Sequence, residues 1–105
     1  MNAENRRRNA EAEMQRAAEA LGEARLLCDA ERWGGAVPRA YYALFHLHFI
    51  RPKDLDPEWG TVFIRLQGYR ERADYGPAVP LPSAEVRREL DNVARFLGVV
   101  RERIG

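Results

Sequence analysis

The chain has 105 residues, of which 46% are hydrophobic and 31% are charged, and its formal net charge is +1. This length excludes a second large domain, and a charge so close to zero excludes a strongly basic surface over the whole molecule. No apolar run is long enough to span a bilayer and the charged N-terminus has no signal-peptide core, so we expect a cytoplasmic protein with no membrane partner.

The first helix is predicted to begin at Ala10 and to end near Ala30, because small and apolar residues recur at steps of three and four. Residues 1–9 are polar and predict a flexible or frayed end, or an exposed first turn. Cys28 is the only cysteine, which excludes an internal disulfide and a cysteine-based metal site. Its position favours a buried small hydrophobe over a nucleophile. The predicted apolar side consists of Ala10, Met14, Ala17, Leu21, Ala24 and Cys28.

The second helix is predicted to follow the double glycine at 34–35 and to end at Ile50, before a proline. Its polar stripe consists of Arg39, Tyr42 and His46. Because seven residues turn a helix by about 700°, Arg39 and His46 project within about 20° of each other. Its apolar stripe is predicted to consist of Val37, Tyr41, Leu44 and His48.

A third helix is predicted to begin at Pro57, with Asp56 as its N-cap, and a proline-rich connection at 76–82 follows it. Ser83 is the predicted N-cap of a fourth helix. The third helix has an apolar side made of Trp59, Val62, Phe63, Leu66, Tyr69 and Ala73. The fourth has a stripe made of Val86, Leu90, Val93, Leu97 and Val100. Its outer faces are expected to carry Glu85, Arg88, Glu89, Asp91, Arg95 and Arg101.

The pattern as a whole predicts an all-α four-helix up-and-down bundle, with residues 10–105 as a single domain. No strand-like alternation occurs in the sequence. Glycine-rich phosphate loops and the HExxH zinc motif are absent. The two histidines, His46 and His48, diverge by about 160° on a helix and cannot share a metal ion. We therefore expect no metal and no cofactor.

The polar stripe suits metal-independent cleavage of a phosphodiester. The Arg39 guanidinium could hold a phosphate, and the His46 imidazole could transfer a proton near neutral pH. A two-fold dimer would bring two copies of this pair to one cleft. On this interpretation Arg39 and His46 are the candidate catalytic residues, and Tyr42, Asp74 and Tyr75 are the candidate substrate-binding residues.

The same residues also fit a purely structural interpretation. Arg39 would pair with Asp74 and tie the second helix to the end of the third, with Tyr41, Tyr42 and Tyr75 packed around the pair. His46 would be a hydrogen-bonded histidine of the core or of an interface. His48, on the apolar stripe, would be structural.

The segment AVPRAYYALFH at 36–46, together with RERADYG at 70–76, resembles the HEPN domain, an all-α bundle often encoded beside minimal nucleotidyltransferases. The resemblance spans roughly residues 10–104, with a shorter segment between Ile50 and Thr61 than relatives usually have. It implies a homodimer. Several members of this superfamily are metal-independent ribonucleases, often toxins of toxin–antitoxin pairs, with an Arg-x4-6-His motif at the dimer cleft. The six residues between Arg39 and His46 match that motif.

Three functions therefore remain open on the sequence alone. The first is a HEPN-like protein that binds or cleaves RNA. The second is a non-catalytic helical module that partners a minimal nucleotidyltransferase or a second copy of itself. The third is a protein that binds a nucleotide or another small ligand. No DNA partner is predicted.

Overall fold

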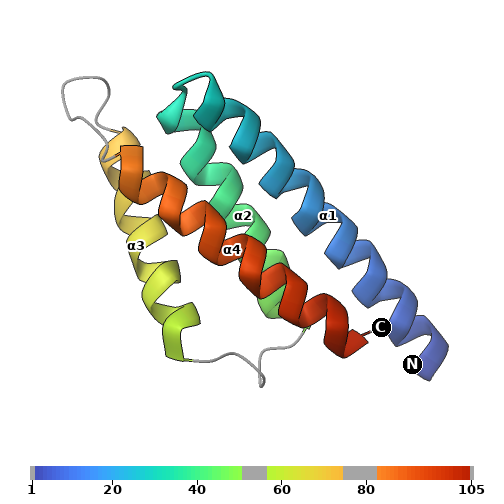
Figure 1. Ribbon diagram of the computed structural model, residues 1–105. Coiled ribbons are helices and arrows are strands. Elements are labelled where there is room, and N and C mark those ends of the chain that lie inside the picture. Colours follow the sequence, from blue (N-terminus) through green and yellow to red (C-terminus); the bar gives the residue numbers. More distant parts are fainter. Residues whose placement is uncertain (1, 51–56, 75–82, 105) are drawn as a thin grey trace.

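The computed structural model describes residues 2–50, 57–74 and 83–104 (Figure 1). The described residues form four helices, α1 (Ala3–Asp29), α2 (Trp33–Ile50), α3 (Pro57–Asp74) and α4 (Ser83–Ile104). Successive helices run in opposite directions, and α4 lies across α2 (Figure 1). Helix α2 contacts each of the other three helices, whereas the described backbones of α1 and α3 stay apart. The predicted all-α architecture of four helices is confirmed.

Helix α1 begins seven residues earlier than the apolar pattern predicts, at Ala3 rather than Ala10. Asn2 caps it, because the Asn2 side chain accepts a hydrogen bond of 2.8 Å from the backbone N–H of Asn5. Ion pairs one turn apart, Arg7–Glu11 and Arg8–Glu4, add helical stability. The first residues are therefore exposed, as expected, and also helical.

The turn between α1 and α2 is built by Glu31 rather than by the double glycine. Glu31 adopts a left-handed φ of 59°, its N–H donates to the carbonyl of Cys28, and the N–H of Arg32 donates to the carbonyl of Leu27. These two hydrogen bonds close the end of α1 as a Schellman motif. Helix α2 consequently begins at Trp33, and the glycines lie in its first turn.

Alanines bring α1 and α2 close together. The buried alanines are Ala17, Ala20 and Ala24 on α1 and Ala36, Ala40 and Ala43 on α2. Gly35 extends this close approach, because a Cβ at this position would lie 3.2 Å from a methyl group of Leu27. The predicted buried side of α1 is confirmed from Met14 to Cys28.

The predicted apolar stripe of α2 is correct for Val37 and Leu44, which are buried, but wrong for His48, which is exposed. Burial is centred near Ala40 and Leu47, where α1 and α4 cover the helix. His48 lies about 100° further round the helix than Leu47 and therefore leaves the core.

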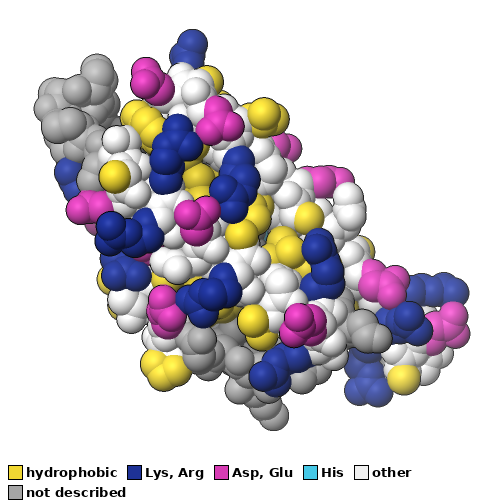
Figure 2. All heavy atoms as spheres, in the orientation of Figure 1, with side chains coloured by type: hydrophobic (Ala, Val, Ile, Leu, Met, Phe, Trp, Pro, Cys, Tyr) yellow, Lys and Arg dark blue, Asp and Glu magenta, His cyan; other side chains and the backbone are white. Residues whose placement is uncertain are grey.

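On α4, the predicted stripe from Val86 to Val100 is buried, but Glu89 is buried with it at 2% exposure. The prediction that Glu89 faces outward is therefore wrong. Glu89 lies three residues after Val86, so it shares the side of α4 that meets α3. There its carboxylate accepts from Arg65 at 3.2 Å. Elsewhere over α4 the surface carries intermixed basic and acidic side chains (Figure 2).

Candidate functional site

The candidate catalytic residues lie on one edge of α2, the edge that faces α1. We call Arg39, Tyr42 and His46 the polar edge. The rings of Tyr42 and His46 meet edge to face, with centroids 4.2 Å apart. Arg39 and His46 both reach acidic side chains of α1. The shared stripe predicted from helical spacing is thus present in the structure.

Arg39 is paired with Glu23 of α1. The Arg39 Nε donates to the Glu23 carboxylate at 3.0 Å, and Nη1 donates to the carbonyl of Gly35 at 3.2 Å. Both side chains are about half exposed. Glu23 is the acidic partner of Arg39 among the described residues, because α1 flanks this edge of α2. The structural interpretation paired Arg39 with Asp74, and that prediction stays untested. The side chain of Asp74 and the whole of Tyr75 lie outside the described residues.

His46 is buried and is held by Glu13 of α1. Its Nδ1 contacts one carboxylate oxygen of Glu13, and the other oxygen accepts from Arg16 at 2.8 Å. The His46 Nε2 is buried and has no hydrogen-bond partner among the described residues. The imidazole therefore presents neither nitrogen to solvent, and one subunit alone offers it no route to a substrate.

Glu13 and Glu23 are the residues of this site that sequence reasoning missed. Both belong to the charged side of the first helix, where glutamates and arginines alternate with no distinguishing pattern. Only the antiparallel pairing of α1 with α2 shows which of them meet Arg39 and His46.

The neighbouring side of α2, which shares Tyr42 with the polar edge, carries an exposed aromatic ridge formed by Tyr42, Phe45 and Phe49. These side chains are 51%, 40% and 64% exposed, and the rings of Phe45 and Phe49 lie 5.0 Å apart. The ridge is open because α4 covers the buried side of α2 while α1 and α3 stay apart. Exposed aromatic groups in a row are typical of interaction surfaces.

A groove of about 610 Å³ runs beside the ridge, between α2 and α3. We call it the α2/α3 groove. Its walls are mainly apolar, and only His48 contributes an ionisable group. Phe45 belongs both to the ridge and to the groove, so the two features form one continuous surface. The groove is lined by Phe45, His48, Pro57, Trp59, Gly60, Phe63 and Ile64.

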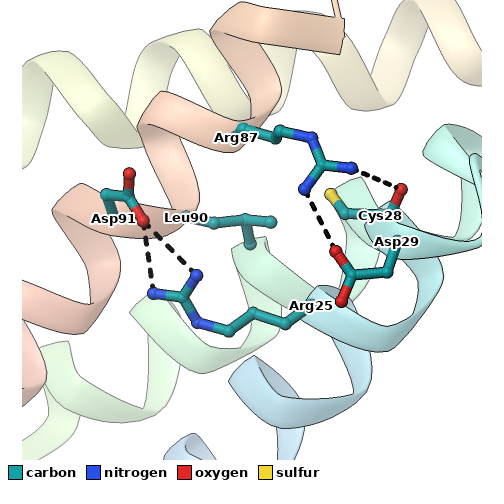
Figure 3. A pocket seen from close by; sticks show the side chains of 6 residues that line it. All are labelled: Arg25, Cys28, Asp29, Arg87, Leu90 and Asp91. Atoms are coloured by element: carbon teal, nitrogen blue, oxygen red, sulfur yellow. Dashed lines mark hydrogen bonds and ion pairs between the residues drawn. The ribbon is translucent and has the colours of Figure 1, made fainter.

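A smaller pocket of about 170 Å³ lies between α1 and α4 (Figure 3). Two ion pairs cross it: Arg25 reaches Asp91 at 3.3 Å, and Arg87 reaches Asp29 at 3.1 Å. Each guanidinium points at a carboxylate of the other helix, so the pair joins α1 to α4 rather than offering free cations to an anion. Burial raises the pKa of the Cys28 thiol at its base, which opposes a nucleophilic role and fits the predicted buried hydrophobe.

The described part of the chain contains no group of three or more His, Cys, Asp or Glu side chains placed to hold a metal ion. Within the same residues, every helix is too short or too polar to cross a membrane.

Comparison of the chain with protein-family models, with curated proteins and with solved structures gave no match. The fold and the comparisons together establish a small all-helical protein of four helices, with no family identified.

Proposed function

We propose that the chain is a HEPN-like helical bundle that works as a non-catalytic interaction module. The HEPN-like assignment is supported by the segments AVPRAYYALFH and RERADYG and by the presence of four successive antiparallel helices. The partner is either a second copy of the chain or a minimal nucleotidyltransferase, and it docks on the aromatic ridge of α2.

The observation that carries this proposal is that Arg39 and His46 each contact a glutamate of α1. A ribonuclease of this type needs a free guanidinium for phosphate and a histidine nitrogen that reaches the reacting oxygen. Here Glu23 already neutralises Arg39, and burial against Glu13 closes off His46. The two groups therefore join α2 to α1 inside a single subunit.

An RNA cleavage assay in EDTA tests the non-catalytic assignment. Total RNA is incubated with the wild type, with Arg39→Ala and with His46→Ala, and Arg7→Ala serves as a control that removes an exposed arginine of α1. We expect all four proteins to leave the RNA intact. Cleavage by the wild type and by Arg7→Ala, lost in Arg39→Ala or His46→Ala, would overturn the proposal.

One observation favours the alternative, a metal-independent ribonuclease. A carboxylate that holds a histidine by one nitrogen is also the arrangement that orients a general base. Glu13 holds His46 in this way. Catalysis would then need a rearrangement that exposes Nε2. In the assay above, this alternative predicts that Glu13→Gln impairs cleavage together with His46→Ala.

A further inference from the structure

We infer that the α2/α3 groove binds a free long-chain carboxylate of the fatty-acid class, with the hydrocarbon chain against the apolar walls and the carboxylate on Arg70. The inference goes beyond the proposed function, because it concerns a small molecule rather than the protein that docks on the ridge. It rests on the size and lining of the groove, on the open space at Gly60, and on the position of an arginine at one end.

The groove has the size and the lining of a small-molecule site. Its volume of about 610 Å³ lies within the roughly 300–1,000 Å³ that is typical of ligand pockets. Its walls combine aromatic rings from both helices with the aliphatic side chain of Ile64, which is 69% exposed. Gly60 keeps the groove open, since a Cβ at this position would meet no atom of another part of the fold within 4 Å. Walls of this kind favour a hydrocarbon over a polar ligand.

Arg70 supplies a positive charge at one end of the groove. Its guanidinium carbon lies 5.2 Å from the centroid of the Tyr41 ring, and that ring packs 4.8 Å from the ring of Phe63, a wall of the groove. Arg70 has no carboxylate partner among the described residues, in contrast to Arg39 and Arg65. A guanidinium stays charged at physiological pH and matches a carboxylate with two parallel N–H donors. This cation can therefore hold the head of an acid whose chain enters the groove.

The spacing along α3 sets the length of the ligand. The ten residues from Gly60 to Arg70 span about 15 Å of helix axis. Arg70 lies seven residues after Phe63, so both side chains project from nearly the same side of α3. A carboxylate on Arg70 would thus place the extended chain of dodecanoate along Phe63. Its methyl end would lie beside Gly60 and Trp59, which also line the groove.

Quenching of tryptophan fluorescence by brominated fatty acids tests the site and its orientation. In a Trp33→Phe background, Trp59 is the only tryptophan. We expect ω-bromododecanoate, with bromine on the methyl end, to quench Trp59 more strongly than α-bromododecanoate, with bromine beside the carboxylate. The opposite order would place the carboxylate beside His48 and would overturn the assignment to Arg70. Equal quenching by the two acids, or none by either, would overturn the proposal.

Two pairs of variants separate the groove from the rest of the surface. Gly60→Leu fills the groove and should abolish the binding of dodecanoate, whereas Gly68→Leu, at another open glycine of α3 that does not line the groove, should leave it unchanged. Arg70→Gln should weaken binding about tenfold, the effect of losing one charge-assisted hydrogen bond. Arg101→Gln, at an exposed arginine of α4, should not. Dodecanol, which lacks the carboxylate, should bind equally to the wild type and to Arg70→Gln. Dodecanoate binding that is unaffected by Gly60→Leu or by Arg70→Gln would overturn the proposal.

Vesicles of phosphatidylcholine and phosphatidylglycerol separate a free acid from a membrane surface. We expect the protein to bind dodecanoate at concentrations at which the acid forms no micelles, and to remain in the supernatant when the vesicles are sedimented. Co-sedimentation with the vesicles would overturn the free acid as the ligand and assign this face to a membrane. None of these outcomes bears on the proposed function, which the RNA assay and the mass of the protein in solution test separately.

Discussion

Glu13 and His46 form a contact across the α1–α2 interface that joins two side chains 33 positions apart in the chain. The histidine is only 8% exposed, so its link to Glu13 is shielded from water along most of its surface. A shielded polar contact of this kind costs more to break than it contributes when formed, because the remaining partner is left without a hydrogen bond.

We predict that Glu13→Ala lowers the free energy of unfolding by about 1–3 kcal/mol, since it removes the one hydrogen-bond partner that the buried imidazole has among the described residues. Glu19→Ala is the matched control. Glu19 is an exposed glutamate of the same helix whose one hydrogen bond among the described residues comes from Gln15, and its loss should cost no more than about 0.5 kcal/mol. Urea denaturation measures both. Equal destabilisation by the two variants would show that the Glu13–His46 contact adds nothing.

We predict that the pair Arg39–Glu23 contributes much less to the free energy of unfolding, no more than about 1 kcal/mol. Both side chains are half exposed, so water screens the pair. Arg39→Ala, Glu23→Ala and the double variant form a cycle that isolates the interaction. A coupling as large as that of the buried histidine pair would contradict the solvent-screened geometry.

Glu31 offers a gain in stability. Its left-handed backbone, at φ 59°, costs a non-glycine residue about 1–2 kcal/mol, and glycine adopts this conformation freely. We predict that Glu31→Gly stabilises the protein by about 0.5–1 kcal/mol after the larger backbone entropy of glycine in the unfolded chain is taken into account. Glu31→Ala, which keeps a Cβ, should bring no comparable gain. A urea denaturation midpoint for Glu31→Gly below that of the wild type would contradict the strain assigned to this turn.

Glu89 makes stability depend on pH. Burial raises the pKa of its carboxyl above the ordinary 4.5, although Arg65, Asn92 and Arg88 all act in the opposite direction. The folded chain therefore holds this proton more tightly than the unfolded chain does. The contribution of Glu89 to stability is fully present below pH 4.5 and is lost as the pH rises through the raised pKa.

We predict that Glu89→Gln removes this loss of stability. The melting temperature of the variant should therefore rise relative to that of the wild type as the pH rises from 4 towards 8. Glu85→Gln, an exposed glutamate of the same helix, should show no such trend. A constant difference between Glu89→Gln and the wild type over this range would mean that the carboxyl titrates normally.

The sequence predicted the number of helices and most of the core, because periodic apolar residues such as those from Val86 to Val100 identify a buried side without knowledge of the neighbours. The sequence did not predict burial that depends on side chains of a neighbouring helix. Glu89 is buried against Arg65 of α3, and His46 is buried against Glu13 of α1. No local sequence pattern identifies either partner. His48 shows the opposite case: its spacing fits an apolar stripe, but no helix covers it.

The aromatic ridge could not have been predicted for the same reason. Tyr42, Phe45 and Phe49 recur at steps of three and four, which is the pattern of a core-facing stripe. Helix α2 is apolar on nearly every side, and only the positions of the other three helices show which side remains open. The candidate catalytic pair was found from spacing, and its glutamate partners were found from the fold.

The mass of the protein in solution tests most directly whether the open side of α2 is a binding surface. Sedimentation equilibrium over a range of concentrations is applied to the wild type, to Phe49→Asp on the ridge and to Leu26→Asp on α1 as the control. We predict twice the chain mass of 12.1 kDa for the wild type and for Leu26→Asp, and 12.1 kDa for Phe49→Asp with an unchanged circular dichroism spectrum. A wild type that remains at 12.1 kDa at every concentration would contradict a second copy of the chain as the partner that docks on α2.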